Sequence, residues 1–425
     1  MNRHFVVKKD TLVYVLSFTI LILYAFTTGL APIIYRSGFL LYGTFILAII
    51  LLFLATSKFR KNSKFTSNEF FSMLIIVLIV FNNNANIRNG AYEQLFFSIT
   101  FYLVFILINR SQDWIKIVLS IVYPIGMFYA AATYFFRLNS EAYYSIVVPL
   151  FSNYTSAYQQ NYAYLNGFMN GFTPNSAINA FYIICSIGIV MSSLIAGDNK
   201  NKLIKIGLII FLAGAILMTG KRAHLMFAIV AIILVYFMSN KKNVLNKYFN
   251  FLIIGIAAII VFIIASQHFP SLLSVFNKFE MQSNEGRIDS GRFVMWTQAF
   301  DFFKSHFFFG LGWDGFKYSY GALFGSTLNV HNVYIQLITE MGVIGSLPFF
   351  AFFINTIRHT IKALKHVCEI NKNTDEKISL VFAFFINIFF LLYGLTGNPL
   401  YDATTLFMYL VSCAIGESFY YNRIN

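Results

Sequence analysis

Basic side chains gather at a few positions of a chain that is otherwise poor in charge. Lys221, Arg222 and His224 lie together in the segment T-G-K-R-A-H, between two apolar runs. The planar guanidinium of arginine matches two phosphate oxygens at once, so this turn is a candidate anion-binding site. The simpler interpretation is a hairpin whose long basic side chains snorkel to a membrane surface.

A second basic cluster is formed by Arg287 and Arg292. Arg292 begins the segment R-F-V-M-W-T-Q-A-F-D-F-F, in which apolar residues recur at helical spacing. We therefore predict an amphipathic helix near residues 291–305, with Trp296 on the face of Arg292 because four residues make about one turn. This segment is either part of a diphosphate site that includes Trp296, or an interfacial anchor helix with a surface arginine.

His331 and Asn332 mark the junction between a long polar segment and the next apolar run. Imidazole is the side chain best suited to accept a proton near neutral pH, so His331 is a candidate general base. A histidine at a helix start is more often a structural hydrogen-bonding residue, and that alternative stays open. Asn332 is a candidate substrate contact beside it.

Several other kinds of active site are excluded by the sequence. It contains no H-E-x-x-H, no G-x-S-x-G and no close pair of aspartates suited to a metal-bound nucleotide sugar. The glycines before Lys221 have the wrong spacing for a Walker A loop, and Gly310–Phe316 follows a helix pattern rather than a strand, which favours a tight turn. Arginines with one histidine suit transfer from a pyrophosphate-linked lipid without a metal or another cofactor.

Composition places these residues in a membrane protein. The chain has 425 residues, of which 58% are hydrophobic and 11% charged, whereas soluble domains carry about 25% charged residues. The net charge of +14 is explained by membrane topology rather than by nucleic-acid binding. The three cysteines have no spacing typical of disulfides or metal sites.

Apolar runs long enough to span a bilayer, about 20 residues, predict an all-α polytopic membrane protein with about twelve transmembrane helices. The third and fourth runs are short. The predicted spans lie near residues 11–31, 38–56, 70–82, 94–109, 114–136, 176–196, 203–219, 223–239, 249–269, 333–356, 379–395 and 404–420.

Most lysines and arginines fall in alternate loops, which predicts cytoplasmic N- and C-termini by the positive-inside rule. Residues 1–425 then form a single transmembrane domain, with an extracytoplasmic helical cap built from the outer loops 137–175 and 270–332. The first loop is rich in Tyr, Asn and Ser. That composition suits either stacking on sugar rings or an aromatic belt at the membrane interface.

The sequence resembles the family of bacterial O-antigen ligases and Wzy-like polymerases of O-antigen or capsule repeat units. The resemblance is carried by S-G-R-F-V-M-W at 290–296, F-G-L-G-W-D-G-F at 309–316 and H-N-V-Y-I-Q-L-I-T-E-M-G-V-I-G at 331–345. T-G-K-R-A-H at 219–224 resembles the short outer turn of the family. Lys221 departs from the small polar residue that is common there, so the donor site is expected to be wider or more basic.

This resemblance implies a GT-C-like membrane glycosyltransferase of the bacterial cytoplasmic membrane, with an undecaprenyl-diphosphate-linked oligosaccharide as donor. Arg222 and Arg292 would hold the diphosphate, and His331 would deprotonate the acceptor hydroxyl, with inversion at the anomeric carbon. Partners would be the lipid-linked glycan, the bilayer and a chain-length regulator, with no nucleic acid.

Three functions compete. A polymerase adds the growing glycan to the next repeat unit, a ligase transfers it to lipid A-core or another surface acceptor, and a flippase carries it without making a bond. The Tyr- and Asn-rich loop favours the polymerase. A carrier is expected to show two similar halves or broken helices, neither of which is evident in the sequence. Further candidates for the acceptor path are Arg88, Arg137, Tyr393 and Asp402.

Overall fold

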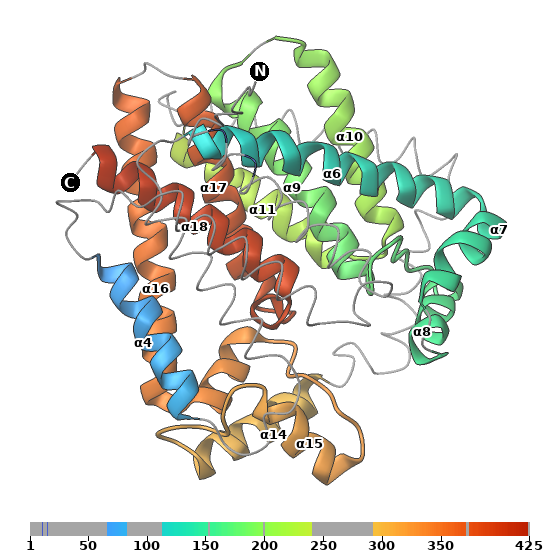
Figure 1. Ribbon diagram of the computed structural model, residues 1–425, viewed down its shortest axis with the longest axis vertical. Coiled ribbons are helices and arrows are strands. Elements are labelled where there is room, and N and C mark those ends of the chain that lie inside the picture. Colours follow the sequence, from blue (N-terminus) through green and yellow to red (C-terminus); the bar gives the residue numbers. More distant parts are fainter. Residues whose placement is uncertain are drawn as a thin grey trace, which may run out of the picture.

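The computed structural model describes residues 66–82, 113–151, 154–198, 200–239, 292–370 and 374–423, together with Thr11 and Val15. All regular structure in these ranges is helical (Figure 1), which confirms the predicted all-α class for this part of the chain. Apart from Thr11 and Val15, the predicted spans 11–31, 38–56, 94–109 and 249–269 lie outside the described residues, as do Arg88 and Arg287.

The long helices coincide with predicted apolar runs. They are α4 (Ser67–Phe81), α6 (Asp113–Leu138), α9 (Ser176–Ala196), α10 (Lys202–Met218), α11 (Arg222–Ser239), α16 (Val333–Ile370), α17 (Thr374–Tyr393) and α18 (Ala403–Arg423). Within the described ranges, five helices are long and apolar enough to cross a membrane, namely α6, α9, α11, α16 and α17. The chain is therefore a multi-pass helical protein, and the predicted number of about twelve spans stays a prediction.

Helices α9 and α17 lie at the centre of the bundle (Figure 1). α9 packs against α6, α10, α11 and α17, and α17 also packs against α16 and α18. Gly188 of α9 allows this closeness, because a Cβ at that position would lie 2.6 Å from the ring of Phe385. Small residues that let helix backbones approach are a common basis of packing in membranes, where lipid is as apolar as the side chains.

Helix α16 differs from the predicted span in two ways. It continues to Ile370 rather than ending near residue 356, so Cys368 lies in a helix and not in the expected loop. Residues 357–370 contain no Gly or Pro, the two residues that most disfavour a helix interior, so the helix can continue through them. The helix is also broken at Gly342, whose φ of 61° and ψ of −170° are not helical.

The turn after α14 (Arg292–Ser305) fills the break in α16. Val343 N donates to Phe307 O at 2.9 Å, and Ile344 N donates to Phe308 O at 3.1 Å. These bonds replace the helical ones that the break removes. A Cβ on Gly342 would lie 2.4 Å from the carbonyl carbon of Phe308, so the two backbones meet where only glycine fits.

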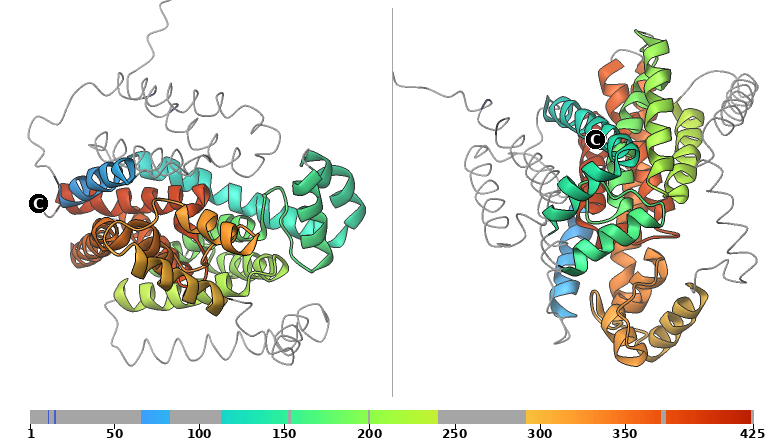
Figure 2. Two further views of the ribbon diagram at one scale, coloured as in Figure 1. Left: turned by 90° about the horizontal axis from the view of Figure 1, so that it is seen from below. Right: turned by 90° about the vertical axis from the view of Figure 1, so that its right-hand side faces the viewer.

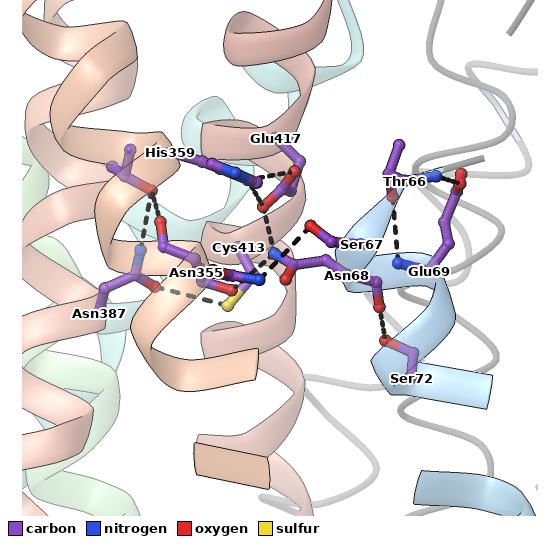
Figure 3. Close-up of polar contacts among 12 residues, drawn as sticks. Thr66, Ser67, Asn68, Glu69, Ser72, Asn355, His359, Asn387, Cys413 and Glu417 are labelled. Atoms are coloured by element: carbon purple, nitrogen blue, oxygen red, sulfur yellow. Dashed lines mark hydrogen bonds and ion pairs between the residues drawn. The ribbon is translucent and has the colours of Figure 1, made fainter. Parts of the chain in front are cut away.

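A buried polar network joins four helices at the other end of α16 (Figure 3). Glu417 of α18 contacts His359 Nδ1 of α16 at 2.8 Å and accepts a hydrogen bond from Asn68 of α4. Asn387 of α17 accepts a hydrogen bond from the Ser412 hydroxyl at 2.6 Å. Such side chains have few alternative partners in an apolar interior, so they fix how the helices are aligned.

Two groups of short helices extend from the bundle (Figures 1 and 2). The first, at the right of Figure 1, contains α7 (Ser140–Ala142), the π-helix η2 (Tyr143–Val147), the 3-10 helix η3 (Val148–Leu150) and α8 (Tyr154–Leu165). The second contains α14 and α15 (Gly315–Phe324), which lie beyond the first turns of α16 in both Figure 1 and the right view of Figure 2.

Candidate active site

His331 is held by the capped start of α16. Asn332 Oδ1 accepts hydrogen bonds from Tyr334 N at 3.0 Å and Ile335 N at 3.1 Å, the geometry of a helix N-cap. Its Nδ2 donates to Leu395 O at 3.2 Å. His331 itself has a φ of 55°, an unusual value for a residue other than glycine. Asn332 therefore positions His331, and a direct contact with substrate stays a prediction.

Helix α14 brings Arg292 to this junction. Trp296 Nε1 donates to Val330 O at 3.0 Å, directly before His331. Ala299 of the same helix is fully buried, and its carbonyl accepts a hydrogen bond from Thr339 Oγ1 of α16 at 3.1 Å. Arg292 lies one turn before Trp296 in α14, so these contacts hold it near the start of α16. Trp296, predicted as a substrate contact, has its indole N–H directed to the backbone.

The electrostatic surroundings of His331 favour the neutral imidazole. Burial lowers the pKa of His331 below its ordinary value of 6.5, and the positive charges of Arg292 and Lys221 lower it further. Two predicted basic clusters, far apart in sequence, thus act on the predicted base. A neutral imidazole at neutral pH can accept a proton, which is the state that a general base needs.

Lys221 comes from the short turn between α10 and α11, as the sequence predicts. The turn is set by Gly220, whose φ is 74°, and by Thr219 Oγ1, which accepts a hydrogen bond from Lys221 N at 3.3 Å. Lys221 Nζ lies 5.7 Å from the centre of the Phe168 ring, a cation–π distance. Arg222 is the partly exposed first residue of α11.

His224 is buried, whereas a residue that contacts substrate at the surface is expected to be exposed. Its side chain is only 2% exposed, and its ring centre lies 4.2 Å from that of Tyr393. Neither ring nitrogen has a hydrogen-bond partner among the residues that the structure describes. The predicted substrate contact of His224 stays a prediction.

The sequence analysis assigned no role to Glu340, a fully buried acid in α16. Its carboxylate accepts hydrogen bonds from Tyr401 Oη at 2.6 Å, Asp314 N at 2.9 Å and Gln336 Nε2 at 3.0 Å. It thus ties α16 to the glycine-rich turn Gly310–Phe316 and to the segment before α18. A glutamate inside an apolar run is the signal that could have revealed it.

The described residues contain no group of three or more His, Cys, Asp or Glu side chains that could hold a metal ion. Of the predicted site residues, Arg292 and Lys221, here called the cationic cluster, lie within electrostatic reach of His331, and Trp296 and Asn332 bond to the backbone around it. Arg287 lies outside the described residues. The arrangement combines positive charge, which can stabilise an anion, with an unprotonated base.

Comparison with known proteins supports the resemblance. Residues 207–350 match the family model described as O-antigen ligase. This range includes the turn with Lys221, helix α14, the glycine-rich turn and His331. No curated protein matches the chain. The matched range thus contains the motifs at 219–224, 290–296, 309–316 and 331–345 that carry the resemblance.

Proposed function

We propose that this protein is a polysaccharide polymerase of the bacterial cytoplasmic membrane. It joins undecaprenyl-diphosphate-linked oligosaccharide repeat units on the outer face, forming O-antigen or capsule, without a metal ion. The main support is the placement of His331 within the electrostatic reach of Arg292 and Lys221. Transfer of a sugar from a diphosphate carrier requires a base for the acceptor hydroxyl and fixed positive charge for the leaving diphosphate.

In the proposed reaction, a hydroxyl oxygen of the acceptor attacks the anomeric carbon of the donor sugar. The bond from that carbon to the phosphate oxygen breaks, and its electron pair leaves with the diphosphate. His331 takes the hydroxyl proton, and the configuration at the anomeric carbon is inverted. Arg292 and Arg222, with Lys221, hold the diphosphate and offset the negative charge that it gains.

The choice of a polymerase rests on the segment between α6 and α9, which is rich in Tyr and Asn and includes α8. A ligase is the second candidate, since the matching family is described by that activity. Both reactions use the same donor and the same cationic cluster, and they differ in the acceptor.

The acceptor is tested by deleting the gene and analysing surface glycan together with extracted lipid-linked intermediates. A polymerase predicts single repeat units at the surface and accumulation of lipid-linked single repeats. Long chains that remain on the carrier lipid would identify a ligase instead. Intermediates trapped on the cytoplasmic side would indicate a transporter and contradict both enzymatic functions.

The base is tested with purified protein and lipid-linked repeat units extracted from the same cells. His331→Ala should keep donor binding and lose turnover by about 100-fold or more, a common loss for a general base. His306→Ala is the matched control, because His306 is exposed and follows α14 on the same side. Equal turnover of His331→Ala and the wild type would remove His331 from the mechanism.

A further inference from the structure

Helix α8 is a short helix without any charged residue, and it carries four tyrosines in the sequence Y-T-S-A-Y-Q-Q-N-Y-A-Y-L. One face is anchored by buried polar contacts. Tyr143 Oη donates to Gln160 Oε1 at 2.7 Å, and Gln160 Nε2 donates to Thr173 O at 2.9 Å. Tyr164 stacks on Tyr143 with ring centres 4.7 Å apart. These contacts therefore fix one face of α8 to the rest of the protein.

The opposite face of α8 presents two aromatic rings to the outside. Tyr158 and Tyr162 are four residues apart, so they share a face, and each is 58% exposed. Their ring centres lie 6.4 Å apart, and the ring planes are inclined by 23°. Gln159 is exposed beside them. These two nearly parallel rings, with Gln159 next to Tyr158 in the sequence, form a small exposed platform.

The chemistry of this platform fits a neutral glycan. The C–H face of a sugar ring can lie flat on an aromatic ring, and an amide can both donate to and accept from sugar hydroxyls. Tyrosine provides contact area at a small cost in conformational entropy, because it has few rotatable bonds. A helix that binds an anionic membrane surface typically has basic residues on its polar face, and α8 has none.

The chain that follows α8 runs to the turn that carries Lys221. Tyr164 of α8 lies 5.7 Å from the guanidinium carbon of Arg137. Three residues after the helix ends, the Phe168 ring lies 5.7 Å from Lys221 Nζ. Gly167, which lies between Tyr164 and Phe168 in the sequence, is also close to Arg137, because a Cβ there would be 3.8 Å from Arg137 Nη2. If the diphosphate of a lipid-linked glycan lies at Lys221, beside Phe168, then α8 is only a few residues away along the polypeptide.

From these observations we propose that the exposed face of α8, formed by Tyr158, Gln159 and Tyr162, binds sugar rings of the glycan remote from the diphosphate. This inference rests on the proposed function, because it takes the glycan of that substrate as the ligand. The proposal adds to that function a subsite that binds the saccharide independently of the carrier lipid.

The test uses protein in nanodiscs and a probe without lipid or diphosphate. The probe is the oligosaccharide released by mild acid from the lipid-linked pool of the same cells, separated into single-repeat and multi-repeat fractions. Tyr158→Ala with Tyr162→Ala should weaken binding of the multi-repeat fraction by about tenfold or more, equivalent to about 1.4 kcal/mol. The matched pair Tyr158→Phe with Tyr162→Phe keeps the rings and should bind like the wild type.

Binding by the double alanine variant equal to that of the wild type, with an unchanged unfolding temperature, would overturn the proposal. A Tyr158→Trp variant distinguishes the membrane alternative. Quenching of its added fluorescence by brominated phospholipids would assign this face to the bilayer and also overturn the proposal. Because the assay measures binding without turnover, an active His331→Ala variant would refute the proposed mechanism and leave the subsite result intact.

Discussion

At the level of single residues, the site depends on charges that come from separate parts of the chain. Arg292 begins a helix that is tied to Val330 through Trp296, while Lys221 comes from the turn between α10 and α11. Both lower the pKa of His331, so the same cations that would bind a diphosphate also keep the base unprotonated. In the proposed mechanism, the same two charges would therefore serve both substrate binding and base activation.

Removing the positive charge of Arg292 should slow the chemical step without unfolding the protein. Fixed charges aimed at a leaving group are worth about 100-fold to 1,000-fold in rate. We expect Arg292→Ala to show a loss of this size in turnover of lipid-linked repeats. Lys304→Ala on the same helix is the control, because that side chain is 76% exposed and pairs only with Asp301 among the described residues. Similar activities of both variants would exclude Arg292 from the mechanism.

The state of His331 can be followed even in inactive variants. Diethyl pyrocarbonate modifies neutral imidazole, and mass spectrometry of the His331 peptide reports the extent of modification at each pH. The wild-type midpoint should lie below 6.5, because burial and then the charges of Arg292 and Lys221 lower the pKa of His331. In Arg292→Ala the midpoint should rise but remain below 6.5, because burial persists. A midpoint that does not move would show that Arg292 does not act on His331.

At the level of helices and turns, the break in α16 determines how the turn after α14 meets the bundle. The backbone of residues 307–312 bonds to α16 on both sides of Gly342, and Glu340 adds its carboxylate to the same turn. The structure thus explains why the motif at 331–345 contains Glu340 and Gly342. The acid receives the N–H groups of the turn, and the glycine opens the helix to admit it.

Gly342→Ala should destabilise the folded protein. The φ of 61° with ψ of −170° is strained for any residue with a Cβ, and that atom would meet the Phe308 backbone, so we expect a loss of about 3 kcal/mol. Gly325→Ala is the matched control, because its φ is 70° but no atom lies within 4 Å of the added Cβ. It should cost about 1 kcal/mol. Thermal unfolding in detergent measures both, and equal losses would refute the steric explanation.

Across the molecule as a whole, polar side chains hold the bundle at the end of α16 opposite the site (Figure 3). Glu417, His359 and Asn68 come from α18, α16 and α4. Contacts between helices so far apart in sequence can be made only in one arrangement of the bundle. The network therefore fixes how α4, α16 and α18 are aligned beyond the break at Gly342.

Glu417→Ala should lower the unfolding temperature, because it leaves His359 and Asn68 buried without their acceptor. Breaking one partner of a buried pair costs about 3 kcal/mol. Glu417→Gln is the control, since an amide oxygen can still accept from Asn68, and it should lose less. If the alanine variant unfolds at the wild-type temperature, the network does not stabilise the bundle.

Much of the fold could be predicted from the sequence, because a bilayer demands long apolar helices whatever their neighbours are. The bounds of α9, α10 and α11 follow the predicted runs closely. The extension of α16 to Ile370 was missed, since a helix can continue into a polar region without changing its local pattern. The amphipathic helix predicted at 291–305 is α14, and of that range only Gly291 lies outside the described residues.

Local sequence is enough to identify the residue types that are available for chemistry. Basic residues and one histidine are conspicuous in an apolar chain because each is costly to place there. Which of them meet is a property of the folded bundle. The fold brings His331 within electrostatic reach of Arg292 and Lys221, buries His224 against Tyr393, and directs Trp296 and Asn332 to the backbone. The physical reason is that burial, electrostatic reach and hydrogen bonding depend on contacts between distant segments, which local sequence patterns do not encode.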